Sequence, residues 1–436
     1  MPEPTAADHD IPFAAWTRQS RQSILREILA LTADPNLLSF ALGMPAAELF
    51  PTPGYARAAQ HVLGHDPRAL QYGMPLRRLR EHVVQLMALR GVECTENEVF
   101  ITTGAQQAMS LLGQLLVTPG GTVVTEELAY DGMLGSLRPL QPRVLTVPSD
   151  PQTGMDVGAL EALLAAGERP ALVYTIPEGH NPLGASMPSA ARRRLAEVAG
   201  CYGVTVIEDD AYGLIDYDGD APPALRSYDG RRVLYVGSFS KIMAPGIRTG
   251  WVVAPEAVVQ RLSILKQGSD LDVTTFAQLA LSAFLDREPF AEHLASLRAA
   301  YAVRRDAMLE ALDAHFPAAA RWSRPRAGMF VWVETPEGVD TTALLRRAVA
   351  EAGVAFVPGQ AFCAAGGVRG RGGLRLNFSR PSPDQIHDGI RRLGRLLQPR
   401  PAVIPLPAGF SPAVGASASA PPRPVPSPST RPLGPR

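Results

Sequence analysis

The chain has 436 residues, of which 46% are hydrophobic and 19% are charged, and its formal net charge at pH 7 is zero. This length and composition predict a globular enzyme with more than one domain and a large core. The balanced charge gives no indication of a nucleic acid or an anionic membrane as partner. No run of about 18 apolar residues is present, so we expect no transmembrane helix.

The cysteines and the N-terminus indicate the compartment. Cys94, Cys201 and Cys363 are odd in number and lie far apart, which is typical of free thiols in a reducing compartment rather than of a disulfide framework. The first residues lack the basic end and apolar core of a signal peptide. His61 and His65 are four residues apart but have no third ligand, so we interpret them as surface histidines. We therefore expect a cytoplasmic protein without a metal site.

The first half of the chain alternates between expected helices and buried strands. In chain order, the sequence predicts an arm over 1–20, a helix over 23–31, a strand-like run over 38–45, a helix over 76–89, a strand from 99 that turns into a helix ending at 116, strands at 123–126, 143–147 and 171–176, a helix over 190–199, and a strand from 204 to the acids at 208–210. This alternation predicts a parallel sheet that is buried on both faces.

The second half predicts a smaller α+β domain and a tail. The elements expected there are a strand at 233–236, a helical region over 255–313, a strand at 328–333, a helix over 342–352, strands at 354–358 and 374–378, and a helix over 383–397. Residues 399–436 hold 12 of the 41 prolines and no acid, which predicts a disordered tail. We predict an N-terminal arm and part of the small domain over 1–45, the large domain over 46–295, and the small domain over 296–398.

The stretch 237–248, GSFSKIMAPGIR, combines hydroxyls, one lysine and one arginine after a buried strand. This set suits a phosphorylated aldehyde, because a lysine forms an imine with an aldehyde while serines and an arginine hold a phosphate. The chain contains only two lysines, Lys241 and Lys266. Lys266 lies in a helix-like stretch, and we interpret it as a solvated helix residue. A surface-loop lysine remains the alternative interpretation of Lys241.

Four polar residues follow predicted strands and are expected to share one site. Asn181, Asp209, Tyr212 and Lys241 lie where buried strands end, and functional groups of such sheets gather beyond the carboxyl ends of the strands. The small-residue turn at 103–105 runs into a helix, whose first N–H groups form an anion site.

Ten motifs, in order, carry a family resemblance. They are LLSFALGMPAAELFP, LQYG, ITTGAQQAM, NPLG, IEDDAY, GSFSKIMAPGIR, QGSDL, GMFVW, FVPG and LRLNFS. Over residues 20–398 the chain resembles the fold-type I pyridoxal-phosphate enzymes of the class I/II aminotransferases, and most of all the 2-aminoadipate and kynurenine aminotransferase group. The resemblance implies an α/β fold, with a mostly parallel central sheet between helices and a smaller α+β domain. It also implies pyridoxal 5'-phosphate as cofactor and the transfer of an α-amino group from an L-amino acid to a 2-oxo acid.

The resemblance assigns roles around the cofactor. Lys241 would form the internal aldimine and carry the proton between Cα and C4′. Asp209, rather than the adjacent Asp210, would pair with the pyridine nitrogen. The other predicted cofactor contacts are Asn181 and Tyr212 at O3′, Tyr130 on the ring face, backbone N–H groups of Ala105 and Gln106 at the phosphate, and the side chains of Ser238, Ser240 and Arg248 beside them.

The resemblance also assigns substrate contacts. Arg375 would hold the substrate α-carboxylate through two hydrogen bonds. Gly43 and Arg26 match positions that touch substrate, and Arg26 could bind a distal carboxylate. Tyr72 matches a tyrosine that reaches the neighbouring cofactor, which implies a homodimer with composite sites.

Departures from the family pattern leave alternatives open. Glu178-Gly179-His180 replaces the usual Ser-Phe-Gln before Asn-Pro, and Ala105 replaces a serine of the phosphate turn. His180 could be an extra acid/base group or a loop histidine. The alternative activities are a pyridoxal-phosphate lyase, cyclase or oxidase acting on an amino acid, and an effector-sensing regulator. About 20 residues precede the matched region, which is too few for a DNA-binding domain.

Overall fold

A computed structural model describes residues 12–18, 37–73, 75–364 and 369–398. Its helices are α1 (Ala15–Arg18), α3 (Thr52–His65), α4 (Arg77–Ala88), α5 (Ala105–Leu116), α6 (Asp131–Leu137), α7 (Val157–Ala165), α8 (Ser189–Tyr202), α9 (Glu256–Ser269), α10 (Thr275–Arg287), α11 (Phe290–His315), α12 (Thr341–Arg347) and α13 (Pro383–Leu397). The helix predicted over 23–31, which would carry Arg26, and the predicted tail over 399–436 lie outside the described residues. The helices predicted over 76–89, 190–199 and 383–397 are confirmed as α4, α8 and α13.

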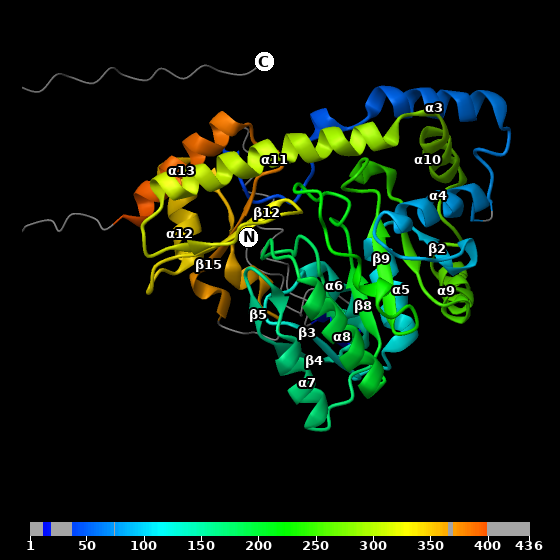
Figure 1. Cartoon of the computed structure of the whole chain (residues 1–436), viewed down its shortest axis with the longest axis horizontal. Coiled ribbons are helices and arrows are strands. Elements are labelled where there is room, and N and C mark those ends of the chain that lie inside the picture. The colour runs from blue at the N-terminus through cyan, green and yellow to red at the C-terminus, as the bar shows by residue number, and fades with distance from the viewer. Residues whose placement is uncertain (1–11, 19–36, 74, 365–368, 399–436) are drawn as a thin grey trace, which may run out of the picture. The chain divides into compact units, whose positions relative to one another are not determined.

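A seven-stranded sheet with the order β2-β10-β9-β8-β7-β3-β4 forms the centre of the large α/β part (Figure 1). Its strands are β2 (Val99–Thr102), β3 (Thr122–Glu126), β4 (Arg143–Val147), β7 (Leu172–Thr175), β8 (Val206–Asp209), β9 (Val233–Ser238) and β10 (Gly250–Val253). The pairs from β9 to β4 are parallel, as predicted, and β10 runs antiparallel to both β9 and β2. β10 was not predicted, because it is only four residues long and directly follows the loop after Lys241.

The sheet is buried on both faces because successive side chains point to opposite sides of a strand. Phe100 of β2 and its partner Val252 of β10 pack into the core that contains Leu111 of α5. Their neighbours Ile101 and Trp251 pack into the core with the apolar side of α4. This two-sided burial explains the apolar runs in the sequence, and it fixes the strand ends where the polar residues follow.

A second, antiparallel sheet has the order β11-β12-β15-β14. Its strands are β11 (Arg321–Trp322), β12 (Phe330–Glu334), β14 (Val357–Pro358) and β15 (Gly373–Asn377). Arg375 lies on β15 between β12 and β14, opposite Trp332 and Val357. Helix α11 runs along this sheet and on toward α3 and α10 of the large part (Figure 1). The domain boundaries at 45, 295 and 398 stay predictions.

The remaining pairs involve short strands. Of the strand-like run predicted over 38–45, only β1 (Leu38–Ser39) is a strand, and it pairs in parallel with β13 (Val354–Ala355). β5 (Ser149–Asp150) and β6 (Gly154–Met155) form a hairpin. The helix predicted over 342–352 consists of α12 followed by a π-helical turn over Ala348–Ala352. None of the described helices is both long and apolar enough to cross a membrane.

Candidate active site

Lys241 follows β9 in the loop that the sequence singled out. Its Nζ donates a hydrogen bond to the carbonyl oxygen of Gly43 at 2.7 Å. Burial lowers the pKa of the Lys241 ammonium to about 8, and the positive charges of Arg375 and Arg248 act in the same direction. A lysine with such a pKa supplies a neutral amine, the form that attacks an aldehyde or removes a proton, near neutral pH. The structure thus brings Gly43 and Lys241 together.

The two acids at the end of β8 have different surroundings. Asp209 is buried, and its Oδ2 accepts a hydrogen bond from the hydroxyl of Tyr174 at 2.7 Å, whereas its Oδ1 is buried without a hydrogen-bond partner among the described residues. Burial raises the pKa of Asp209 to about 6. Asp210 is instead occupied, because its Oδ2 accepts from Arg90 Nε at 2.9 Å and from the Tyr235 hydroxyl at 3.1 Å.

A buried carboxylate oxygen without a partner calls for a donor from outside the chain. The protonated ring nitrogen of pyridoxal phosphate is such a donor. Asp209 therefore fits the cofactor on an observation that is independent of the motif around it, and Asp210 is committed to Arg90.

Two tyrosines surround the same space. Burial raises the pKa of the Tyr212 hydroxyl, and the neighbouring Tyr130 and Asp209 raise it further while the charge of Arg375 opposes them. Burial and Asp209 likewise raise the pKa of Tyr130, against the charges of Arg375 and Arg248. The charges of Asp209 and Arg375 act on both hydroxyl groups, so the two tyrosines lie near the same acid and the same guanidinium.

The turn between β2 and α5 has the form of a phosphate site. Gly104 has a φ of 81°, and a Cβ there would lie 2.7 Å from Nη2 of Arg248, so only glycine fits. The same Nη2 donates to the carbonyl oxygen of Thr103 at 3.1 Å. The Gln106 amide nitrogen donates to Gly132 O and Ser136 Oγ, at 2.6 Å each, which directs this side chain away and leaves its backbone N–H for an anion.

Ser238 and Ser240 lie at the end of β9, in the loop that carries Lys241. The backbone N–H of Ser240 donates to Ser238 Oγ at 3.1 Å, and the two hydroxyl oxygens are 3.0 Å apart. Arg248 reaches the phosphate turn from the same loop. One loop therefore supplies the hydroxyls, the cation and the amine that a phosphorylated aldehyde requires.

Arg375 is buried, with 3% of its surface exposed, between the rings of Phe330 and Phe362, whose centroids lie 4.3 and 4.8 Å from its guanidinium carbon. Its Nη1 donates to Asn181 Oδ1 at 2.7 Å and its Nη2 to Ala41 O at 2.6 Å, while Nε has no partner among the described residues. Burial lowers the pKa of Arg375 to about 10. A buried N–H without a partner fits a carboxylate as ligand.

Three further residues that the sequence singled out are Tyr72, Arg26 and His180. Tyr72 is 86% exposed. Arg26 lies outside the described residues. His180 is buried; its Nδ1 accepts from the backbone N–H of Leu183 at 3.3 Å, and its Nε2 is 3.5 Å from Oε1 of Glu126, which is also buried.

Lys266 corrects the sequence interpretation. It is 2% exposed rather than solvated, because its Nζ donates to Gln107 Oε1 and to Asp270 Oδ1, each at 2.8 Å. The four-residue spacing of Lys266 and Asp270 was a visible signal for this ion pair. The second partner, Gln107 on α5, could not be predicted, because only the packing of α5 against α9 brings it to Lys266.

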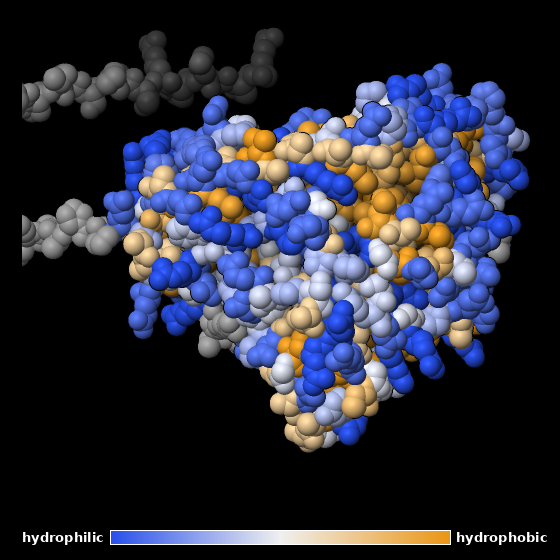
Figure 2. Space-filling view, in the orientation of Figure 1, coloured by the Kyte–Doolittle hydropathy of each residue, from blue (hydrophilic) through white to orange (hydrophobic). Residues whose placement is uncertain are grey.

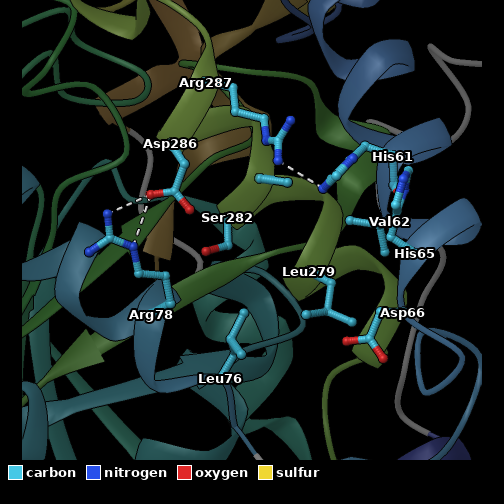
Figure 3. Close-up of a pocket in the computed structure, with 11 residues that line it drawn as sticks. His61, Val62, His65, Asp66, Leu76, Arg78, Leu279, Ser282, Asp286 and Arg287 are labelled. Atoms are coloured by element: carbon cyan, nitrogen blue, oxygen red, sulfur yellow. Dashed lines mark hydrogen bonds and ion pairs between the residues drawn. The ribbon is translucent and has the colours of Figure 1, made fainter.

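A hollow is lined by residues of α3, α4 and α10 and of the segments beside them (Figure 3). Among its lining residues, Arg78 donates to Asp286, and Arg287 contacts His61 Nε2 at 2.8 Å. It contains none of the predicted site residues. No group of three or more possible metal ligands occurs among the residues that the structure describes.

Comparison with known proteins places the chain in a family. Residues 38–393 match the family of class I and II aminotransferases. A 2-aminoadipate transaminase of Thermus thermophilus is 40% identical over 88% of this chain and 96% of its own length, and aromatic-amino-acid aminotransferase 1 of Thermococcus litoralis is 35% identical over 91% and 96%. The crystal structure of an α-aminoadipate aminotransferase from Thermus thermophilus, complexed with N-(5'-phosphopyridoxyl)-L-leucine, superposes with a TM-score of 0.81 at 39% identity over 88% of this chain and 97% of that chain. The chain therefore belongs to the class I and II aminotransferases.

Proposed function

We propose that this pyridoxal-phosphate enzyme moves the α-amino group of an L-amino acid to a 2-oxo acid, with the residues described above in the roles predicted for them. Family membership gives the reaction class and the cofactor. The observation that supports the residue roles best is the buried Oδ1 of Asp209, which lacks a partner among the described residues and so fits the ring N–H of the cofactor.

When bound, pyridoxal phosphate would supply an electron sink for the pair that remains when the Cα–H bond of the amino acid breaks. Lys241, as the neutral amine, would act as the base that removes the proton from Cα of the amino acid and, once protonated, as the acid that returns it. Asp209 would hold the ring nitrogen of the cofactor by accepting a hydrogen bond from its N–H, and so would keep that nitrogen protonated. Asn181 and Tyr212 would hold O3′ of the cofactor, and Tyr130 would contact its ring.

The substrate carboxylate would bind Arg375. The guanidinium is already oriented by Asn181 and by Ala41 O, so little side-chain entropy remains to be lost on binding. Its position between two phenylalanine rings excludes water and strengthens the ion pair. This arrangement selects α-carboxylates over amines that lack one.

The substrate side chain is proposed to be acidic or aromatic. Two of the relatives are named for 2-aminoadipate and for aromatic amino acids, and Arg26 would bind a distal carboxylate. If so, Arg26→Ala should raise KM for 2-aminoadipate and leave KM for phenylalanine unchanged. An equal change for both substrates would remove Arg26 from this role.

The enzyme is proposed to act as a homodimer with Tyr72 entering the neighbouring site. Tyr72 is 86% exposed, Leu70 is 81% exposed and Leu63 is 52% exposed, which leaves apolar surface next to α3 for a partner to cover. Hydrophobic residues also gather beside the end of α11 near α10 on the face shown in Figure 2. The free Cys94, Cys201 and Cys363 support a reducing compartment, and we propose the cytoplasm.

The test is the visible spectrum of the protein while amino acids are added singly without an acceptor. Transamination predicts loss of the visible band of the bound cofactor, with one 2-oxo acid formed per site. Recovery of the band with continuing release of ammonia, or oxygen uptake, would contradict the proposal in favour of a lyase or an oxidase. The amino acid that bleaches the band at the lowest concentration identifies the donor.

A further inference from the structure

Lys266 is the buried member of a hydrogen-bonded network that reaches the phosphate turn. Its Nζ, on α9, contacts Gln107 Oε1 in the first turn of α5 and Asp270 Oδ1 at the end of α9, each at 2.8 Å. Gln107 closes the network, because its Nε2 donates to Asp270 Oδ2 at 2.6 Å. Burial works to raise the pKa of Asp270, but hydrogen bonds from Lys266 and Gln107 lower it below its usual value. The carboxylate is therefore ionised, and the network is an ion pair bridged by an amide.

This network holds Thr103, the residue before Gly104. The backbone N–H of Thr103 donates to Gln107 Oε1 at 2.8 Å, and its hydroxyl donates to Asp270 Oδ2 at 3.1 Å. The carbonyl oxygen of Thr103 accepts from Arg248 at 3.1 Å. All three polar groups of Thr103 are thus occupied, which fixes the backbone that leads into the first N–H groups of α5.

We propose that Lys266, through Asp270 and Gln107, is a positioning residue for the phosphate of the cofactor. Lys266 orients the turn at Thr103 and Gly104 so that the N–H groups of α5 and the guanidinium of Arg248 converge on one anion. It also neutralises Asp270, which would otherwise repel the phosphate from beside the turn. This role rests on the proposed function.

The test compares two ligands that differ by one group. Apo protein is titrated with pyridoxal phosphate and with pyridoxal, which lacks the phosphate, and binding is followed by absorbance. Lys266→Met is expected to raise the Kd for pyridoxal phosphate about 10- to 100-fold, the usual effect of replacing a residue that orients a ligand-binding group. The Kd for pyridoxal should stay unchanged within about threefold. Arg261→Met removes an exposed cation of the same helix and should change neither Kd.

A neutral pair separates charge from geometry. In Lys266→Met/Asp270→Asn the unpaired anion is gone, so part of the lost affinity for pyridoxal phosphate should be recovered. The same double variant replaces the single variant in the titration if the single variant does not fold. Inorganic phosphate should raise the melting temperature of wild-type apo protein more than that of Lys266→Met. Equal losses for both ligands, or no loss for either, would overturn the proposal. If the wild type itself binds no pyridoxal phosphate, the proposed function fails instead.

Discussion

Arg192 and Glu178 form a fully buried ion pair next to the loop that carries Asn181. The Nη2 of Arg192 lies 2.5 Å from Oε2 of Glu178, and both side chains are excluded from solvent. Arg192 also donates to the carbonyl oxygens of Met187 at 2.8 Å and Pro177 at 3.0 Å. Glu178 is one of the residues in which this chain departs from the family pattern.

Replacing Arg192 by leucine leaves Glu178 as a buried charge without a cation. Breaking a buried pair in this way costs about 3–5 kcal/mol. For a chain of this length that corresponds to a fall in Tm of about 4–6 °C. Because Glu178 lies three residues before Asn181, whose Oδ1 accepts from Arg375, kcat/KM should also fall by about tenfold or more.

The assay is thermal unfolding at saturating cofactor together with steady-state kinetics. Arg194→Leu is the matched control, because Arg194 lies on the same helix and pairs with Glu161 at the surface, where such pairs contribute about 0–1 kcal/mol. The double variant Arg192→Leu/Glu178→Leu should recover most of the stability, since apolar residues often replace a buried pair without loss. A single variant with unchanged Tm and kinetics, or a double variant no more stable than the single one, would refute this reasoning.

Four further predictions concern the site itself. Burial and the charge of Arg375 lower the pKa of Lys241 from 10.5 to about 8. Because capture of the cofactor by apo enzyme needs the neutral amine, its rate should rise with pH up to about 8 and then level off. A rise that continues to pH 10 would contradict this. Asp209→Asn should lower kcat/KM about 100-fold or more, whereas Asp210→Asn should chiefly lower Tm. Arg375→Lys should raise KM for amino and 2-oxo acid about 30- to 100-fold, and an unchanged KM would remove it from the carboxylate site. Mixed dimers of Lys241→Ala and Tyr72→Ala subunits should regain activity that neither homodimer has, because one site then holds both native residues; inactive hybrids would place Tyr72 in its own subunit's site.

The strand ends of the large sheet could be predicted from the sequence because two-sided burial demands apolar runs. Val233 to Val236 and the run before Asp209 are such stretches, and the polar residue after each was expected at the same edge. β10 was missed because a four-residue strand after a Gly- and Pro-containing loop has too little pattern to recognise. The helix at 157–165 was not predicted either.

Side-chain pairing could not be predicted from spacing alone. Lys266 was interpreted as solvated because its sequence neighbours gave no sign of Gln107 as a partner. Only the packing of α5 against α9 brings Gln107 to it. The preference for Asp209 over Asp210 rested on a motif, and the structure adds the physical reason, which is that Arg90 occupies Asp210. That arginine lies 120 residues earlier in the chain, where no local pattern marks it as a partner.

The central claim is that the amino group passes from donor to acceptor at the site of Lys241. A ¹⁵N-labelled amino acid and an unlabelled 2-oxo acid are incubated with the holoenzyme, and both products are followed by mass spectrometry. The account predicts that the label appears in the new amino acid, in equal amount to the 2-oxo acid formed from the donor, and that Lys241→Ala abolishes this transfer. Label released as ammonia, or transfer that persists in Lys241→Ala, would contradict it.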